Sequence, residues 1–176
     1  MMDQIILSGF GGQGVMFIGK VLAYAAMKGD LQVCWIPSYG PEMRGGTANC
    51  SVIISDEEIN SPVLDQADAA IVLNQPSYDK FLPRIKSGGV LVINSSIVEN
   101  NKARDDIKII AIPATDIANR LGKSALANMV CLGALMPALK LIDIDSLEKA
   151  LDAVVGTNKP ELYEANIQAI KEGMEW

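Results

Sequence analysis

A cluster of glycines near the start of the chain has the spacing of a phosphate-binding loop. Residues 9–14 read GFGGQG and satisfy the pattern G-x-G-x-x-G, between a short apolar run and a stretch with helical periodicity. Glycine permits a tight turn, and a helix N-terminus offers unpaired N–H groups to an anion. The alternative is that these glycines only let a strand and a helix pack closely. The candidate ligand-binding residues here are Gly9, Gly11, Gly12, Gln13 and Gly14.

A second candidate site is the polar loop from Ser38 to Thr47, which contains three glycines and one proline. It follows a strand-like run, so in a parallel sheet it lies beside the glycine cluster. The guanidinium of Arg44 can bind a phosphate or a carboxylate, and Tyr39 offers a hydroxyl or a ring for stacking. The alternative is an internal ion pair between Glu42 and Arg44 that stiffens the loop. The candidate binding residues of this loop are Ser38, Tyr39, Arg44, Gly45, Gly46 and Thr47.

The sequence argues against ordinary dinucleotide chemistry. An NAD site needs an acidic residue at the end of the second strand to bind the ribose hydroxyls, and this strand runs into Pro37 and Ser38 instead. Asp30 lies at the wrong end of that strand. A free-standing nucleotide-binding domain, either a dehydrogenase or a redox regulator, therefore stays a weaker alternative.

Polar side chains also follow two buried strand-like runs and open the most apolar segment. These are Asn74-Gln75, Asn94-Ser95-Ser96 and Asn128. Such residues fit a ligand crevice, but they also fit turns and helix caps, and we favour capping because these side chains strongly prefer it.

The composition excludes several classes of catalytic machinery. The chain contains no histidine, which rules out Ser-His-Asp and Cys-His nucleophiles and a histidine general base. The three cysteines, Cys34, Cys50 and Cys131, are widely spaced and form no CxxC motif. We therefore expect no catalytic residue and no metal site in this chain, and three structural, reduced thiols.

Charge and hydropathy limit the partners. The net charge of −6 gives no electrostatic footprint for nucleic acid or for anionic lipid, so we expect neither. The most apolar stretch, residues 129–139, is 11 residues long and far short of the ~20 that span a bilayer. The first ten residues include Asp3 and no basic segment, unlike a signal peptide, so we expect a cytoplasmic protein.

Alternating strand-like and helix-like segments predict an α/β fold. Residues 69–73, 90–93 and 109–112 are nearly continuous aliphatic runs, which is expected of parallel strands covered by helices on both faces. Residues 48–55 alternate between apolar and polar, as in an edge or an antiparallel strand. The prediction is a three-layer, mostly parallel open sheet, Rossmann-like, with a helical C-terminal third, in a single domain over residues 1–176.

Helix boundaries can be predicted from caps and prolines. We expect helices over residues 77–85, interrupted at Pro83, over 116–121 with Thr115 as N-cap, and over 125–141 with a kink at Pro137. A capping box over residues 145–148 predicts the next helix, and Pro160 begins the last one.

Taken together, these motifs resemble the gamma subunit of 2-oxoacid:ferredoxin oxidoreductases. The resemblance rests on LSGFGGQG at residues 7–14 and on SYGPEMRGG at 38–46, followed by TANC at 47–50 and Ser61-Pro62. Further matches are PATDIA at 113–118 and NMVCLGA at 128–134, so it covers nearly the whole chain. The loop at 38–46 is much more specific than the glycine loop.

The resemblance implies a subunit of a complex that oxidatively decarboxylates a 2-oxoacid with coenzyme A and reduces ferredoxin. In such complexes alpha and beta subunits hold thiamine diphosphate, and beta or delta subunits hold iron–sulfur clusters. This chain would dock on the thiamine-bearing subunits and help to position coenzyme A, with Gly11, Gly12, Gly14 and Arg44 at its phosphates.

The short gamma chain resembles the 2-oxoglutarate branch more than those acting on pyruvate, branched-chain 2-oxoacids or indolepyruvate. The isolated chain would be inactive. A purely structural subunit, whose glycine loop holds no ligand, is the remaining alternative.

Overall fold

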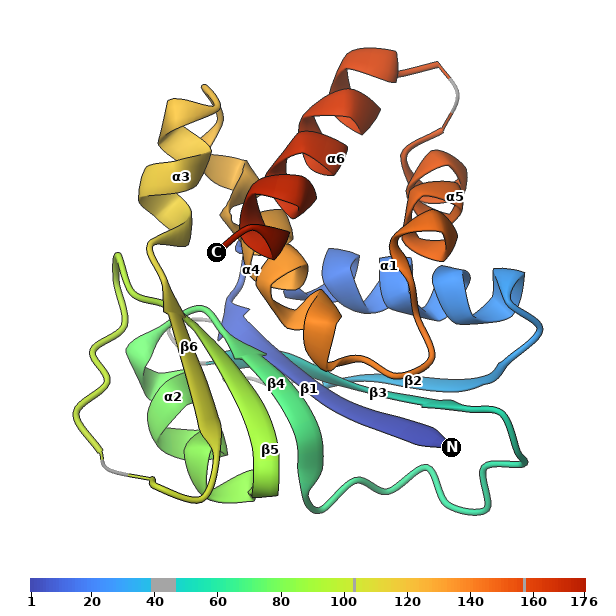
Figure 1. Cartoon of the computed structure of the whole chain (residues 1–176), viewed down its shortest axis with the longest axis vertical. Helices are drawn as coiled ribbons and strands as arrows, with labels where there is room; N and C mark the ends of the chain where they lie inside the picture. The colour runs from blue at the N-terminus through green and yellow to red at the C-terminus, as the bar shows by residue number, and fades with distance from the viewer. Residues whose placement is uncertain (39–46, 103, 157) are drawn as a thin grey trace.

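A six-stranded sheet in the order β2-β3-β1-β4-β5-β6 forms the centre of the molecule (Figure 1). The computed structural model describes residues 1–38, 47–102, 104–156 and 158–176. The strands are β1 (Met2–Phe10), β2 (Gln32–Ser38), β3 (Thr47–Ser55), β4 (Ala67–Val72), β5 (Ile85–Asn94) and β6 (Lys108–Ile112).

The predicted parallel arrangement holds for four neighbouring strands, because β1, β4, β5 and β6 pair in parallel. β3 is antiparallel to both of its neighbours, β1 and β2, as its alternating pattern allowed. It is not an edge strand, because β2 covers its outer side. β2 itself is the edge, and it continues through Pro37, which was expected to end it. An edge strand tolerates proline because one side of its backbone needs no partner.

Helices cover the two faces of the sheet unequally. One face carries α1 (Val15–Lys28), α4 (Ala127–Leu135), α5 (Ile144–Val155) and α6 (Pro160–Met174), with α3 (Ala114–Arg120) beside them (Figure 1). The other face carries α2 (Gln75–Phe81). The short turns are η2 (Leu82–Arg84), η3 (Ser124–Leu126) and η4 (Met136–Ala138). The three-layer α/β fold is therefore confirmed.

Coverage is weakest at the β6 edge. Residues 109–112 were expected to be buried on both faces, but in β6 Ile109 and Ile110 are half-buried and Ala111 is exposed. The expectation was wrong because an aliphatic run does not reveal where the helix layer stops.

Two predicted caps were also wrong. Asp143, and not the predicted box at 145–148, caps α5: its Oδ1 accepts hydrogen bonds from Ser146 N at 2.8 Å and Ser146 Oγ at 2.6 Å. Thr115 lies inside α3, which begins at Ala114; the N-cap residue of this helix is Pro113, which makes no side-chain cap bond. The predicted helix over 125–141 is α4 followed by η4, where Pro137 cannot extend an α-helical ladder.

α4 and α6 cross at a pair of glycines. A Cβ added at Gly133 would lie 2.0 Å from Ile170 O, and one added at Gly173 would lie 2.0 Å from Val130 O. The two backbones are therefore in direct contact, which only glycine permits. In the described ranges, no helix combines the length and the apolar character that crossing a membrane requires.

A buried carboxylate joins the sheet to the helix layer. Asp3, in β1, is 2% exposed, and its Oδ2 accepts hydrogen bonds from the backbone N–H groups of Lys140 and Leu141 at 2.9 and 3.0 Å. Burial raises the pKa of this carboxyl above its usual 3.8, although the two hydrogen bonds oppose the rise. The segment that follows η4 is thereby fixed to the central strand.

We expect Asp3→Ala to lower the free energy of unfolding by about 2–4 kcal/mol, because it leaves two buried donors without an acceptor. Asp3→Asn keeps an acceptor oxygen and should cost less. Urea unfolding at about pH 7 compares the two. Equal losses of unfolding free energy in the two variants would show that the acceptor oxygen of residue 3 does not contribute to stability.

The pH dependence gives a second check. A raised folded-state pKa means that the folded protein holds this proton more tightly, so the contribution of Asp3 is full below pH 3.8 and is lost as the pH rises through the folded value. Asp3→Asn does not titrate, so its deficit relative to the wild type should shrink as the pH rises from about 3.8.

Candidate functional site

A crevice of about 310 Å³ opens at the carboxyl ends of the central parallel strands. This is the edge at which open α/β sheets bind ligands. Backbone, amide and hydroxyl groups supply its polar lining, and none of the described residues that line it ionises near neutral pH. The lining residues are Gly12, Gln13, Leu73, Asn94, Thr115, Ser124, Ala125, Ala127 and Asn128.

The glycine loop forms one wall, between the end of β1 and the start of α1. Gly12 and Gly14 have φ values of 90° and 79°, in the left-handed region that favours glycine. A Cβ at Gly12 would have no other atom within 4 Å, so the loop leaves open space beside this residue. The predicted strand–loop–helix context of the motif is confirmed.

Gln13 holds this loop in place through its side chain. Its Oε1 accepts a hydrogen bond from Phe10 N at 2.6 Å, and its Nε2 donates to Leu73 O, at the end of β4, at 3.0 Å. Gly9, within β1, is needed because a Cβ there would lie 2.6 Å from Gln13 Oε1. Of the five predicted residues, Gly9 and Gln13 thus shape the loop. Gly9 leaves room for the Gln13 side chain, and both polar atoms of that side chain are hydrogen-bonded within the protein.

The N-terminus of α1 faces this region without a side-chain cap. The cap residue is Gly14, and the first turn contains no acidic residue. The first N–H groups of a helix have no intrahelical acceptor, and the helix dipole adds partial positive charge. These groups can bind a phosphate or another anion.

Two asparagines connect the crevice walls. Asn128, 6% exposed, donates from Nδ2 to Gly14 O at 3.4 Å and accepts from Met129 N at 2.8 Å. Asn94, at the end of β5, donates from Nδ2 to Thr115 Oγ1 at 2.8 Å. Sequence reasoning favoured capping for both. Capping holds for Asn74, the N-cap residue of α2, which accepts from Ser77 N. It also holds for Asn94, whose Oδ1 accepts from Ser96 N and Thr115 N at 3.3 Å each. Asn94 and Asn128 line the crevice as well.

Thr115 and Ser124 were missed as crevice residues. Thr115 follows the carboxyl end of β6 by three residues, and that position in a parallel sheet was the available signal. Ser124 begins η3, and its sequence context gave no comparable signal.

The second predicted loop is described only at its two ends, Ser38 and Thr47. β3 is antiparallel to β1 and β2, and Phe10, just before the glycine loop's turn, pairs with Thr47. These two ends therefore lie at the end of the sheet that carries the glycine loop. Ser38 is exposed and lines a separate pocket of about 150 Å³ with Asn49 and Ser51. Tyr39, Arg44, Gly45 and Gly46 lie outside the described residues.

The cysteines take no part in the crevice. Burial raises the pKa of the Cys50 thiol to about 11 and raises that of Cys131 further, so both stay protonated at neutral pH. Cys34 is half-buried on β2. Over the described ranges, the cysteine and acidic side chains form no group that could hold a metal ion.

Comparisons with known proteins point to one family. The model of the pyruvate ferredoxin/flavodoxin oxidoreductase family matches residues 4–176. The 2-oxoglutarate synthase subunit KorC of Methanocaldococcus jannaschii is 39% identical over 99% of this chain and 94% of its own length. The ketoisovalerate oxidoreductase subunit VorA of Methanothermobacter marburgensis is 35% identical over 98% of this chain, which spans only 36% of that longer relative.

A solved structure agrees in fold. The gamma subunit of a keto/oxoacid ferredoxin oxidoreductase from Geobacter sulfurreducens has a TM-score of 0.84 and 32% identity, over 98% of this chain and 96% of its own.

We expect Gly14→Ala to destabilise the protein more than Gly12→Ala. Both positions have positive φ, which costs about 1–2 kcal/mol for alanine. At Gly14 the added Cβ would also lie 2.2 Å from Asn128 Nδ2, which should add about 1–3 kcal/mol.

Asn128→Ala supplies the control. In that background the difference between the two glycine substitutions should largely disappear, as urea unfolding of the four variants would measure. A difference that persists unchanged would contradict the proposed contact.

Proposed function

This chain belongs to the pyruvate ferredoxin/flavodoxin oxidoreductase family, and on that premise we propose that residues 1–176 form a single gamma-type domain of a 2-oxoacid:ferredoxin oxidoreductase. The complex would cleave a 2-oxoacid to carbon dioxide and an acyl group, transfer the acyl group to coenzyme A, and pass the two electrons released to ferredoxin. This chain would dock on the thiamine-bearing subunits and help to position coenzyme A.

The observation that carries this proposal is the open, uncapped start of α1 beside the crevice. Gly12 leaves space for a ligand, and Gly14 leaves the first amides of the helix free of a side-chain acceptor. A phosphate of coenzyme A fits these groups. The amides and hydroxyls of Asn94, Thr115 and Ser124 suit a polar, uncharged part of the same ligand.

The described lining has no cationic side chain, so a positive charge that binds a phosphate would come from other residues. Arg44 lies in the sequence between Ser38 and Thr47, the described ends of β2 and β3 on this side of the sheet, so we propose it as a charged phosphate ligand. Ser38, Tyr39, Gly45, Gly46 and Thr47 complete the proposed binding loop.

The other cofactors belong to partner subunits in this proposal. A four-cysteine iron–sulfur cluster needs more thiolates than the three scattered cysteines can supply. Thiamine diphosphate and the clusters would be held by alpha and beta subunits, with a delta subunit in some complexes. Ferredoxin would accept its electrons from the clusters of these partner subunits, and the isolated chain would be inactive.

The 2-oxoglutarate branch is the preferred substrate assignment. The relative named as a 2-oxoglutarate synthase subunit matches this chain over nearly its whole length and at higher identity than the ketoisovalerate relative. The free-standing dehydrogenase is less well supported, because β2 ends at Ser38 with no acidic residue.

We expect anaerobic purification through this chain to recover thiamine-binding and iron–sulfur subunits. The isolated complex should reduce ferredoxin with 2-oxoglutarate and coenzyme A faster than with pyruvate or 3-methyl-2-oxobutanoate. Mass spectrometry, the visible spectrum and the three rates measure this. A partner-free, colourless chain would overturn the proposal, and a faster rate with another acid would correct only the substrate.

Gly12→Asp in the assembled complex should raise the KM for coenzyme A by about tenfold or more, because it puts a negative charge where a phosphate would bind. Gly12→Asn is the matched control, since it has the same size and the same backbone strain without the charge. The KM for the 2-oxoacid should stay unchanged in both.

Arg44→Ala should raise the same KM, and Arg44→Lys should restore part of the loss. If all four variants assemble and show the same KM for coenzyme A, the glycine loop has only a structural role.

A further inference from the structure

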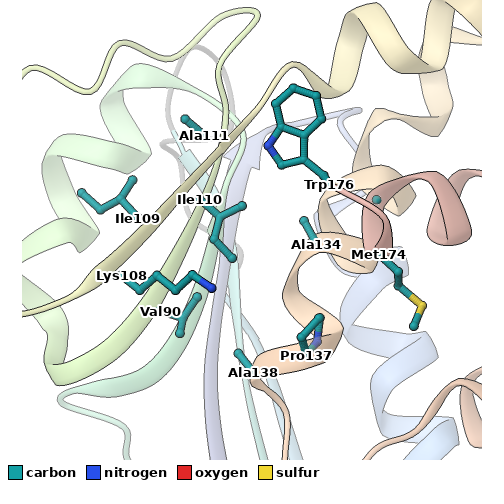
Figure 2. Close-up of a pocket in the computed structure, with 11 residues that line it drawn as sticks. Val90, Lys108, Ile109, Ile110, Ala111, Ala134, Pro137, Ala138, Met174 and Trp176 are labelled. Atoms are coloured by element: carbon teal, nitrogen blue, oxygen red, sulfur yellow. The ribbon is translucent and has the colours of Figure 1, made fainter.

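A larger cavity, of about 530 Å³, lies at the opposite edge of the sheet from β2 (Figure 2). Figure 2 shows Val90, Lys108 and Ile110 on the strand side, and Pro137, Met174 and Trp176 on the helix side. We call this cavity the β6 groove. Apart from Lys108, the side chains that line it carry no charge.

The β6 groove exists because the helix layer ends before the sheet does. Ile109 and Ile110 are only half-buried, and Ala111 is exposed. On the helix side, Met174 is 38% exposed and Trp176 is 62% exposed. An apolar surface of this kind, at an unpaired sheet edge, is typical of a site that another polypeptide covers.

The backbone of β6 indicates what form the covering segment takes. Ser95 N donates to Ile112 O at 2.8 Å, and Ile112 pairs in parallel with Asn94, so even-numbered residues of β6 direct their backbone groups toward β5. Odd-numbered residues therefore direct theirs outward. Among the described residues β5 is the strand that pairs with β6, so no strand covers the outward amides of Ile109 and Ala111. An added strand would pair with them.

Two observations identify the partner as a different chain. Lys108 has the single charged side chain in the lining, which an acidic side chain opposite would complement, whereas a second copy would bring another Lys108. The VorA relative, of which this chain spans 36%, carries much additional polypeptide, so domains of this family lie beside further protein.

We propose that a partner subunit of the oxidoreductase complex adds an extended segment to β6 as a seventh strand. Its apolar side chains would fill the β6 groove, and an acidic residue would lie beside Lys108. This inference rests on the proposed function, because it takes the partner from the same complex.

The test uses the complex purified anaerobically through an N-terminal tag, because Trp176 lines the groove. Hydrogen exchange over residues 107–113 should be at least about a hundredfold slower in the complex than in the isolated chain. A carbodiimide should join Lys108 Nζ to a partner carboxylate as an amide, and mass spectrometry would identify the partner peptide.

Ala111→Pro removes one outward N–H while keeping a strand-compatible backbone, and edge strands tolerate this change. It should weaken partner binding by about tenfold, whereas Ala111→Ser, which keeps the N–H, should not. Lys108→Glu should weaken binding more than Lys108→Gln. The circular dichroism spectrum and the melting temperature of each isolated variant check that it folds.

The outcomes separate the two proposals. If thiamine and iron–sulfur subunits are recovered but residues 107–113 exchange as in the isolated chain, or folded Ala111→Pro binds them like Ala111→Ser, the seventh strand is wrong and the proposed function stands. A cross-link from Lys108 to a second copy of this chain would also overturn the inference. Failure to recover those subunits with the wild-type chain overturns both.

Discussion

The carboxamide of Gln13 holds together the part of the molecule on which the crevice depends. One atom of it accepts from Phe10 N and the other donates to Leu73 O, so a single planar group joins the end of β1, the start of α1 and the end of β4. This group also lies 2.6 Å from the position that a Cβ at Gly9 would take. Asn128 then ties α4 to the same loop through Gly14 O.

The described residues of the crevice are polar but uncharged. Binding of a charged ligand there would therefore need charged groups from other parts of the chain or from another subunit. An anion at the start of α1 would meet oriented amides, whose partial charges are weaker than a full cation. In the proposed function, the remaining attraction would come from residues outside the described lining, Arg44 among them, or from an adjacent subunit. Affinity for a phosphorylated ligand would then depend on how the chain is assembled.

Local patterns predicted the elements well and their surroundings poorly. Elements that are determined by residues adjacent in the chain could be predicted from the sequence. These are the glycine loop, the long aliphatic strands and the start of α6 at a proline. Asn94 caps a local turn through Ser96 N, as the sequence predicted, but its place in the crevice depends on its contact with Thr115, which only the fold brings near it. The exposure of β6 likewise depends on where the α4 helix stops. Arg44 and Tyr39 remain predictions from the sequence.

The backbone contact between Gly133 and Gly173 has a consequence for biosynthesis. Asn128 to Leu135 of α4 are all buried, and part of their cover is α6, which leaves the ribosome last among the helices described. Until α6 has been synthesised, this apolar helix is not covered, and the nascent chain exposes a hydrophobic surface that can aggregate. Side chains at the two crossing points would keep α6 from packing onto α4, so the burial of this helix late in synthesis depends on both glycines.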